Sequence, residues 1–476
     1  MKTRIVSACM AFIWLCGLLS SCGNPDLPSS AAGDPMSDDI SRGESTAMNT
    51  TVVSSVTEET TLTRQDGETS TESSTDTTSA VTTAPSVSED TFPARLDRAG
   101  KDLELSLIKA QRRSFSVKNA LASEDRGDAV RVANVIRKAC NGEKIKVGVL
   151  GDSIGQGAGA SPVGQSFANR VFDWWTAVFG SDRVELVNAS IGSNTLTNIV
   201  HRMDSDLLSK NPDIVFVSAW DCHASEDNFA IESILKRLLD KGIAVVLVQV
   251  TASNGMNRYS LFADVARHYK VPLISYANAY EKSDYTWKDV GADSIHPSNT
   301  GHALIALCVN SFLQETAQAL DSIGTTPATL PNAPLRTQGW RYVNATIWDR
   351  NNSGKFTIIQ KGSFADFDRK MTSFRTYNGW KSSVTGDVLE CKLSSIKTLH
   401  LMCNYVSGGG GKASVTVTGD DGTKYIENFT VNTDPENNQD YSWNTALLAK
   451  NVNQPVTVQI KVTGGTFILL GFMVTV

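Results

Sequence analysis

Three kinds of segment are missing from this sequence of 476 residues, and each absence excludes a class of protein. None of the eight cysteines forms a C-x-x-C pair, so neither a zinc ribbon nor a thiol-redox motif is expected. The chain has no run of Lys and Arg, and its formal net charge is -6, which argues against a nucleic-acid partner. Beyond the N-terminal segment, no apolar run is long enough to span a bilayer.

The first 22 residues are typical of a targeting segment. Lys2 and Arg4 precede an apolar stretch, and two serines lead directly to Cys22. This pattern resembles a bacterial lipobox, in which cleavage before the cysteine leaves Cys22 to be lipidated. An ordinary secretory signal with a chance cysteine is the alternative. We expect a protein at the bacterial cell surface, lipid-anchored or secreted, that meets the membrane only through an N-terminal lipid anchor.

Composition divides the rest of the chain into three parts. Residues 23–93 are dominated by Ser and Thr without apolar periodicity, which predicts a disordered stalk. Residues 94–325 begin with a helical lead-in, and strand patterns then alternate with helical ones. That alternation predicts a three-layer α/β/α domain with a parallel sheet. Residues 334–476 contain short β-rich segments between turns, which predicts an all-β, jelly-roll-like sandwich.

In the α/β domain we expect strands over 144–150, 183–189, 213–219, 243–250 and 271–276. The helical patterns between and after them cover 165–179, 196–210, 226–241, 258–269 and 299–316. Within the second of these helices, His201 is expected on a solvated face. In a parallel sheet of this kind, ligands bind beyond the C-terminal ends of the strands.

Two motifs carry chemically capable side chains to those strand ends. Ser153 follows the first strand in "VGVLGDSIGQGAGA", a Gly-rich turn that exposes a hydroxyl and leaves backbone N–H groups free. Asp293 and His296 follow the last strand in "GADSIHPSNTGHALIAL". A histidine there can take the serine proton while the aspartate orients its ring. Each motif alone is a common turn, but together they predict a Ser-His-Asp triad.

With these motifs in this order, residues 130–316 resemble the SGNH/GDSL hydrolase family. "VGVLGDSIGQGA" is similar to the family's first block, "VNASIGSNT" to the second and "DSIHPSNTGHA" to the last, while "NPDIVFVSAWDCH" stands at the third. The resemblance implies a flavodoxin-like domain, Ser153 as nucleophile, and Asp293 and His296 as its acid and base, without a cofactor. It extends to secreted members with a C-terminal β-sandwich.

The sequence departs from the family in the oxyanion hole, the set of N–H donors that holds the developing negative charge. The resemblance implies the backbone N–H groups of Ser153 and of Gly192 or Ser193 as donors, with Ser193 at the family's usual glycine. The third block lacks the usual asparagine, since residues 220–223 are Trp-Asp-Cys-His. Loss of one donor costs about 10²–10³ in rate. We expect Asn194 or His223 to take its place.

These observations favour a cell-surface serine esterase that removes acyl groups from a carbohydrate through an acyl-enzyme on Ser153. Acetyl is the acyl group we expect. Two alternatives stay open: an O-acyltransferase using the same triad, and a glycan-binding lipoprotein with an impaired hydrolase fold. No metal is expected at residues 221–223, because successive residues of a strand point to opposite faces. Whether Cys391 and Cys403 form a disulfide or remain buried thiols is also open.

Overall fold

The computed structural model describes residues 91–121, 126–220, 225–256, 259–352, 354–405, 410–433 and 441–476. The signal peptide with Cys22, nearly all of the expected stalk, and Asp221, Cys222 and His223 lie outside the described residues. The predictions made for them stay predictions, as do the domain boundaries at 93, 325 and 334. Within the described ranges, no helix is long and apolar enough to span a membrane.

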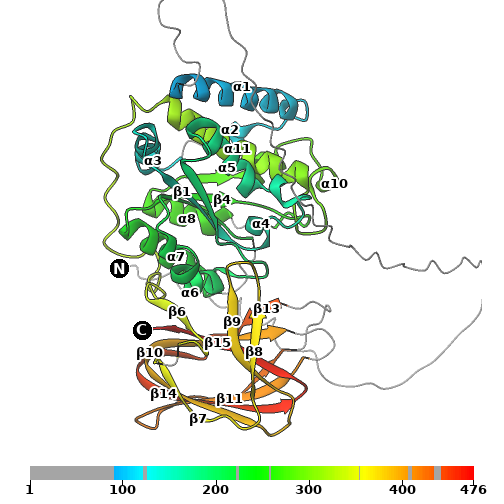
Figure 1. Cartoon of the computed structure of the whole chain (residues 1–476), viewed down its shortest axis with the longest axis vertical. Coiled ribbons are helices and arrows are strands. Elements are labelled where there is room, and N and C mark those ends of the chain that lie inside the picture. Colours follow the sequence, from blue (N-terminus) through cyan, green and yellow to red (C-terminus); the bar gives the residue numbers. More distant parts are fainter. Residues whose placement is uncertain are drawn as a thin grey trace, which may run out of the picture. The chain divides into compact units, whose positions relative to one another are not determined.

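A parallel sheet forms the middle layer of the first domain (Figure 1). Its five described strands are β1 (Ile145–Gly151), β2 (Val184–Asn188), β3 (Ile214–Ser218), β4 (Ala244–Gln249) and β5 (Leu273–Ser275). They are ordered β2-β1-β3-β4-β5, and all neighbours run parallel, which is the flavodoxin-like order. Every residue of β3 and β4 is buried, which explains their continuous apolar runs. The predicted three-layer fold is confirmed.

Helices cover both faces of this sheet, and side chains of β3 alternate between two cores. Ile214 and Phe216 pack in the first core with α1, α3, α5 and α11. Val215 and Val217 pack in the second core with α6, α7 and α8. The α-helices are α1 (Phe92–Gln111), α2 (Val117–Ala120), α3 (Val130–Cys140), α4 (Ser153–Gln156), α5 (Phe167–Phe179), α6 (Leu196–Asp206), α7 (Asp227–Asp240), α8 (Tyr259–Tyr269), α9 (Tyr276–Glu281), α10 (Trp287–Val290) and α11 (Asn299–Gln318).

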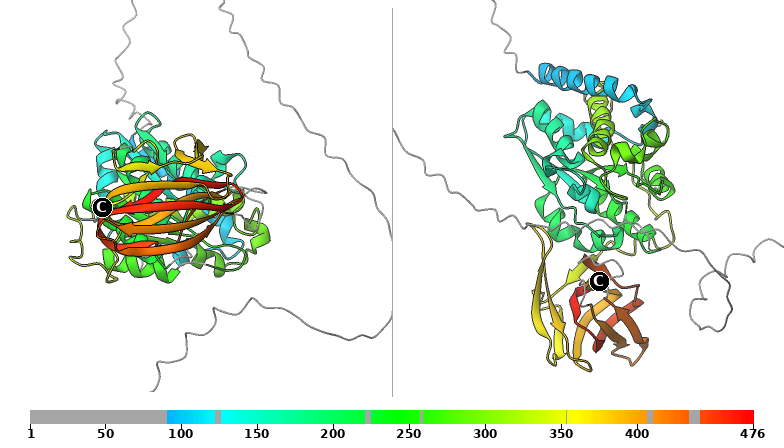
Figure 2. Two further views of the ribbon diagram at one scale, coloured as in Figure 1. Left: turned by 90° about the horizontal axis from the view of Figure 1, so that it is seen from below. Right: turned by 90° about the vertical axis from the view of Figure 1, so that its right-hand side faces the viewer.

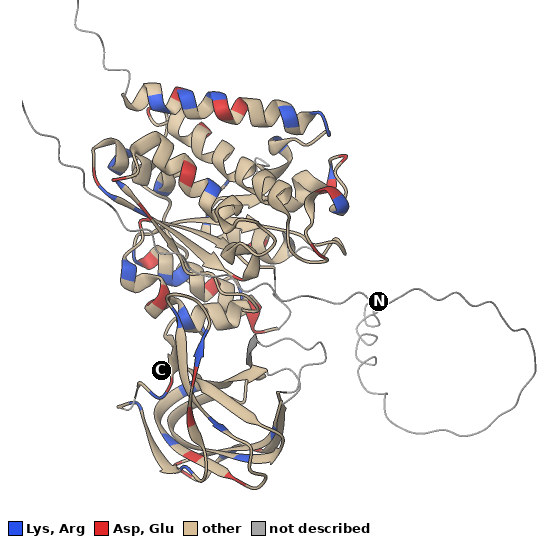
Figure 3. Cartoon of the chain, turned by 45° about the vertical axis from the view of Figure 1, so that its right-hand side comes forward, with Lys and Arg blue, Asp and Glu red and all other residues tan. Residues whose placement is uncertain are grey.

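Charges of both signs are mixed along the outer helices. Figure 3 shows Lys and Arg interspersed with Asp and Glu along α1. One such pair joins Lys101 Nζ to Asp97 Oδ2 at 2.7 Å, one helical turn apart, with both side chains largely exposed. Exposed pairs of this kind contribute little to stability, so the helix is held mainly by its buried face.

The second domain is built from antiparallel strands that hydrogen-bond into one ten-stranded sheet within the described residues (Figure 2). The strands are β6 (Ala345–Trp348), β7 (Phe356–Gln360), β8 (Ala365–Lys370), β9 (Thr376–Ser382), β10 (Val388–Tyr405), β11 (Lys412–Gly419), β12 (Lys424–Asn432), β13 (Tyr441–Asn444), β14 (Ala449–Gly464) and β15 (Phe467–Thr475). The predicted all-β domain is confirmed.

The long strand β10 lets this sheet enclose a core. Its first half pairs with β7 and β14 and its second half with β15 and β13, with register shifts between Leu393 and Thr398. Such irregularities bend a strand. Cys391 and Cys403 lie in the resulting core, and both are free thiols. The question left open by the sequence is therefore decided against a disulfide.

Helix α6 meets the all-β domain through buried aromatic rings, and this corrects the expectation for His201. His201 is buried rather than solvated, with ring centroids of Tyr342 and His400 at 5.2 and 5.9 Å. Its Nδ1–H donates to the Thr197 carbonyl oxygen at 2.7 Å, and its Nε2 has no partner among the described residues. Burial, and then the nearby His400, lowers the pKa of His201 from 6.5 to about 3.

This buried histidine makes stability depend on pH. Because the pKa of His201 is lower in the folded than in the unfolded chain, its full stabilisation is present above about pH 6.5 and is lost as the pH falls toward 3. Between about pH 7.5 and about pH 5 the loss amounts to about 2 kcal/mol. We expect His201→Phe, which keeps an aromatic ring but cannot titrate, to flatten the dependence by that amount in urea unfolding. Parallel curves for the variant and the wild type would contradict the assignment.

Candidate active site

Ser153 occupies the first turn after β1, and buried hydrogen bonds hold that turn. It is the first residue of α4, and Asp152 caps this helix by accepting from the Ile154 N–H at 3.0 Å. The other carboxylate oxygen of Asp152 accepts from the Trp220 N–H at 2.6 Å. Asp152 is 1% exposed, so these charge-assisted bonds lie away from water. They tie the end of β1, which presents Ser153, to the end of β3.

Gly157 and Gly159 shape this turn, and Gly159 brings it against the segment that carries His296. Gly157 ends α4 with a φ of +105°, and Gly159 has a φ of +87°, both in the region that favours glycine. A Cβ on Gly159 would lie 2.2 Å from the Pro297 carbonyl oxygen and 3.0 Å from the His296 Cβ. The Gly-rich turn noted in the sequence therefore allows a close backbone approach to His296.

The three residues predicted as a triad lie within hydrogen-bonding distance of one another. His296 Nε2 is 2.9 Å from Ser153 Oγ, and His296 Nδ1 is 2.7 Å from Asp293 Oδ2. With a proton on Nδ1 donated to the carboxylate, Nε2 is left to accept the serine hydroxyl proton. The loop over 293–296 thus brings a nucleophile, a base and an orienting acid together in the order that acyl transfer requires.

Asp293 is held in its ionised form by its own loop. Burial raises the pKa of this carboxyl, but hydrogen bonds from the His296 and Ile295 N–H groups and from the His296 ring outweigh it, so that the pKa is lowered. Both backbone bonds to Oδ1 measure 2.8 Å. The Asp293 side chain is still 56% exposed, so water screens its charge. Its hydrogen bond with His296 Nδ1, at 2.7 Å, fixes the orientation of the ring.

Two further side chains that touch this region give no catalytic signal in the sequence. Trp287 Nε1–H donates to the Asp293 carbonyl oxygen at 2.5 Å. His302 Nδ1 accepts from the Phe167 N–H at 3.2 Å, and its Nε2–H donates to the Ala158 carbonyl oxygen at 3.0 Å. Burial lowers the pKa of His302, which stays neutral in this tautomer. His302 therefore fixes the Gly-rich turn to the start of α5.

The oxyanion loop, residues 189–194, lies directly against the nucleophile. A Cβ on Gly192 would lie 3.5 Å from the Ser153 Cβ. The Gly192 N–H donates to Gln156 Oε1 at 2.7 Å. Ser193, which stands at the family's glycine, has a φ of +58° and so adopts the left-handed conformation that glycine would favour. The structure thus places the backbone of Gly192 next to Ser153, and Ser193 follows it directly in the chain.

The two side chains expected to replace the missing asparagine have different outcomes. Asn194 is fully buried inside the oxyanion loop, where its Nδ2 donates to the Gly192 carbonyl oxygen at 3.2 Å and its Oδ1 accepts from Arg202 Nε at 2.7 Å. His223 lies outside the described residues. Asn194 therefore supports the loop. No contact among the described residues identifies a side chain that replaces the family's asparagine.

Arg202 is a site residue that sequence reasoning missed. Its guanidinium is fully buried and donates to the Gly151 carbonyl oxygen at 3.0 Å, to Asn194 Oδ1, and to the Ala189 carbonyl oxygen. It thereby joins the strand end before Ser153 to both ends of the oxyanion loop. An arginine on an amphipathic helix ordinarily lies on the solvated face, and no motif marks this one.

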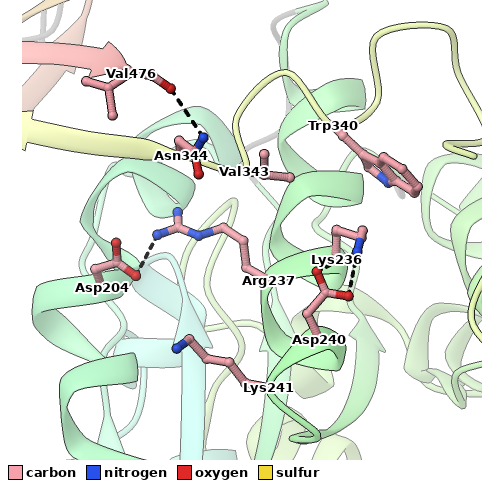
Figure 4. Close-up of a pocket in the computed structure, with 9 residues that line it drawn as sticks. All are labelled: Asp204, Lys236, Arg237, Asp240, Lys241, Trp340, Val343, Asn344 and Val476. Atoms are coloured by element: carbon pink, nitrogen blue, oxygen red, sulfur yellow. Dashed lines mark hydrogen bonds and ion pairs between the residues drawn. The ribbon is translucent and has the colours of Figure 1, made fainter.

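Among the described residues, neither a cluster that could hold a metal ion nor the surface cavity beside α7 coincides with this site. Within the described ranges, no group of three or more His, Cys, Asp or Glu lies close enough to hold a metal ion. One cavity has a volume of about 630 Å³, and its lining residues, drawn in Figure 4, include none of the three triad residues. Two of its charged groups are paired, Arg237 with Asp204 at 2.6 Å and Lys236 with Asp240 at 2.5 Å. Because these four side chains pair with each other, their charges are already balanced.

Comparison with known proteins agrees with the fold and the motifs. Residues 149–304 match the model of the GDSL-like lipase/acylhydrolase family. This match to a GDSL-like lipase/acylhydrolase domain lies within the α/β domain and agrees with the resemblance found in the sequence. A search of curated proteins found no match.

Two solved structures share both domains with this chain. One is a two-domain esterase active on acetylated mannans, co-crystallised with mannopentaose; it is 22% identical over 76% of this chain and 98% of its own, with a TM-score of 0.65. The second, described as a two-domain esterase active on acetylated mannans, is 21% identical with the same coverage and a TM-score of 0.64. At this identity the likeness establishes the arrangement of an α/β hydrolase domain with an all-β domain.

The left-handed conformation of Ser193 makes this position sensitive to the shape of its side chain. We expect Ser193→Val to lower the free energy of unfolding by about 1–3 kcal/mol, because a β-branched residue disfavours positive φ. Ser193→Gly is the matched control and should stay within about 1 kcal/mol of the wild type, because glycine adopts this conformation without strain. Chemical denaturation measures both. A valine variant as stable as the wild type would contradict the conformation.

Proposed function

We propose that the protein is a serine esterase that removes acetyl groups from a carbohydrate through an acyl-enzyme on Ser153. The observation that carries this proposal is the separation of 2.9 Å between His296 Nε2 and Ser153 Oγ, with Asp293 2.7 Å behind the same ring. A glycan-binding protein whose hydrolase fold had lost catalysis would not need to keep these three groups within hydrogen-bonding distance. The geometry therefore favours retained chemistry over the scaffold alternative.

The proposed reaction uses each of these groups in turn. Ser153 Oγ attacks the ester carbonyl while His296 Nε2 takes its proton, and Asp293 stabilises the resulting imidazolium. The tetrahedral intermediate collapses when His296 gives the proton to the leaving sugar oxygen, which leaves an acetyl group on Ser153. Water, activated by His296, then attacks the acyl-enzyme and releases acetate and the free serine.

We propose the backbone N–H groups of Ser153 and Ser193 as donors to the oxyanion. The N–H of Ser153 is at the start of α4, where helical N–H groups have no intrahelical acceptor. The N–H of Gly192 is engaged by Gln156 Oε1, so it joins only if that side chain moves. Asn194 supports the loop through its amide, and His223 remains the candidate for a side-chain donor.

The carbohydrate part of the proposal is supported by the two-domain esterases that share both domains of this fold, since they are active on acetylated mannans. Fold likeness at this identity does not transfer a substrate by itself. Acetyl transfer to a sugar hydroxyl would use the same triad, with the acceptor oxygen in place of water. The released product therefore distinguishes hydrolysis from transfer.

The experiment that tests the function measures acetate release from acetylated mannan, acetylated xylan and 4-nitrophenyl acetate. We expect release from at least one acetylated glycan, and we expect Ser153→Ala to lower the rate by about 10³-fold or more, because the nucleophile is lost. Oligosaccharide acceptors that become acetylated without acetate release would identify a transferase. Equal rates for the wild type and Ser153→Ala would overturn the esterase proposal.

We also propose that the protein is held at the bacterial cell surface by lipid on Cys22, which the lipobox-like sequence before this residue supports. Cys22→Ala removes the thiol that would carry the lipid. We expect the wild type to partition into the detergent-rich phase on extraction with Triton X-114, and the variant to stay in the aqueous phase. Aqueous partitioning of both proteins would exclude the anchor and leave a secreted protein.

A further inference from the structure

The oxyanion loop is held from beneath by one buried guanidinium. Arg202 donates to the Ala189 carbonyl oxygen at one end of the loop and to Asn194 Oδ1 at the other, where the bond measures 2.7 Å. The same group donates to the Gly151 carbonyl oxygen at 3.0 Å, two residues before Ser153. A shift of this guanidinium would therefore move the oxyanion loop relative to the nucleophile.

The charge of Arg202 is balanced by a carboxylate that is shared with the all-β domain. Asp206 Oδ2 accepts from Arg202 Nη1 at 3.2 Å, and Asp206 Oδ1 accepts from Arg375 Nη1 at 3.1 Å. The side chains of Arg202, Asp206 and Arg375 are 0%, 2% and 13% exposed. Arg375 precedes β9 and lies over the Tyr377 ring, with its guanidinium carbon 4.4 Å from the centroid. A chain of buried charges thus runs from the all-β domain to the oxyanion loop.

The competition for Asp206 explains why Arg375 matters to the loop. A carboxylate attracts a guanidinium more strongly than a neutral carbonyl or amide oxygen does, and two parallel bonds are its preferred arrangement. Arg375 satisfies one carboxylate oxygen, as does the Ser205 hydroxyl at 2.8 Å. Arg202 can therefore give its remaining N–H groups to neutral acceptors around the site. Without Arg375, the undivided charge of Asp206 would draw Arg202 away from Gly151 and Asn194.

We propose that Arg375 of the all-β domain is a positioning residue for the hydrolase site: through Asp206 and Arg202 it sets the oxyanion loop against Ser153. This inference rests on the proposed esterase function for its kinetic consequence, while its structural consequence can be measured without activity. It gives the all-β domain a role in the chemistry that is separate from any binding of glycan.

The test compares the mature wild-type protein with Arg375→Met, Arg375→Lys and Arg350→Met. With 4-nitrophenyl acetate, we expect Arg375→Met to lower kcat by about 10- to 100-fold with KM within about twofold, because a misplaced loop loses stabilisation of the transition state. Arg375→Lys keeps the charge beside Asp206 and should restore kcat to within about threefold of the wild type. Hydrogen–deuterium exchange should show faster uptake over residues 189–194 in Arg375→Met alone.

Arg350→Met is the matched control, because Arg350 also belongs to the all-β domain and bonds two carboxylates. It pairs with Asp366 at 2.9 Å and with Asp368, and none of these groups belongs to the charge chain. We expect wild-type kcat and wild-type uptake over residues 189–194 for this variant.

The outcomes separate this inference from the proposed function. If the wild type hydrolyses no ester, the function is wrong, and deuterium uptake still decides the positioning role. Wild-type kcat and wild-type uptake in Arg375→Met would overturn the role. A uniform rise in uptake across the hydrolase domain, without rescue by lysine, would show general loss of folding and would also overturn it.

Discussion

A single buried arginine lies where the nucleophile turn, the oxyanion loop and the all-β domain meet. The guanidinium of Arg202 is fully enclosed, and its N–H groups are divided among two backbone carbonyls, one amide oxygen and the carboxylate of Asp206. An enclosed cation of this kind is tolerated only when its hydrogen bonds are satisfied. Because those acceptors come from β1, from the loop after β2 and from α6, the positions of all three depend on one side chain.

The arrangement of Ser153, His296 and Asp293, the proposed triad, rests on a second set of constraints, which come mainly from the backbone. Gly159 lets the Gly-rich turn approach the Pro297 carbonyl oxygen, and Asp152 joins the end of β1 to that of β3. The loop N–H groups of residues 295 and 296 hold Asp293, whose side chain is more than half exposed. A site assembled in this way has a rigid nucleophile and an orienting acid that water can reach. In the proposed reaction, His296 accepts and returns a proton in each of the two steps, and this arrangement keeps its ring oriented for both.

The two departures from the family's oxyanion hole, Ser193 in the second block and the missing asparagine in the third, have different structural consequences. Ser193 keeps the conformation expected of a glycine, so the departure at this position costs strain but no N–H donor. Asn194, offered by the sequence as a substitute donor, has its amide engaged with Gly192 and Arg202 inside the loop. In the proposed oxyanion hole, the donors are the backbone N–H groups of Ser153 and Ser193, with His223 as the candidate for a side-chain donor.

The sequence by itself determined the parallel sheet and the all-β domain, and it predicted the three residues that the structure brings within hydrogen-bonding distance, Ser153, Asp293 and His296. Alternating apolar patterns are local and report burial, and the two motifs stand at strand ends that a parallel sheet must bring to one edge. It did not reveal that His201 is buried, that Cys391 and Cys403 stay apart, or that Arg375 reaches Asp206 from 169 positions along the chain. Those facts were decided by tertiary structure, because charge pairing and ring packing across domains depend on distances in space that no local pattern encodes.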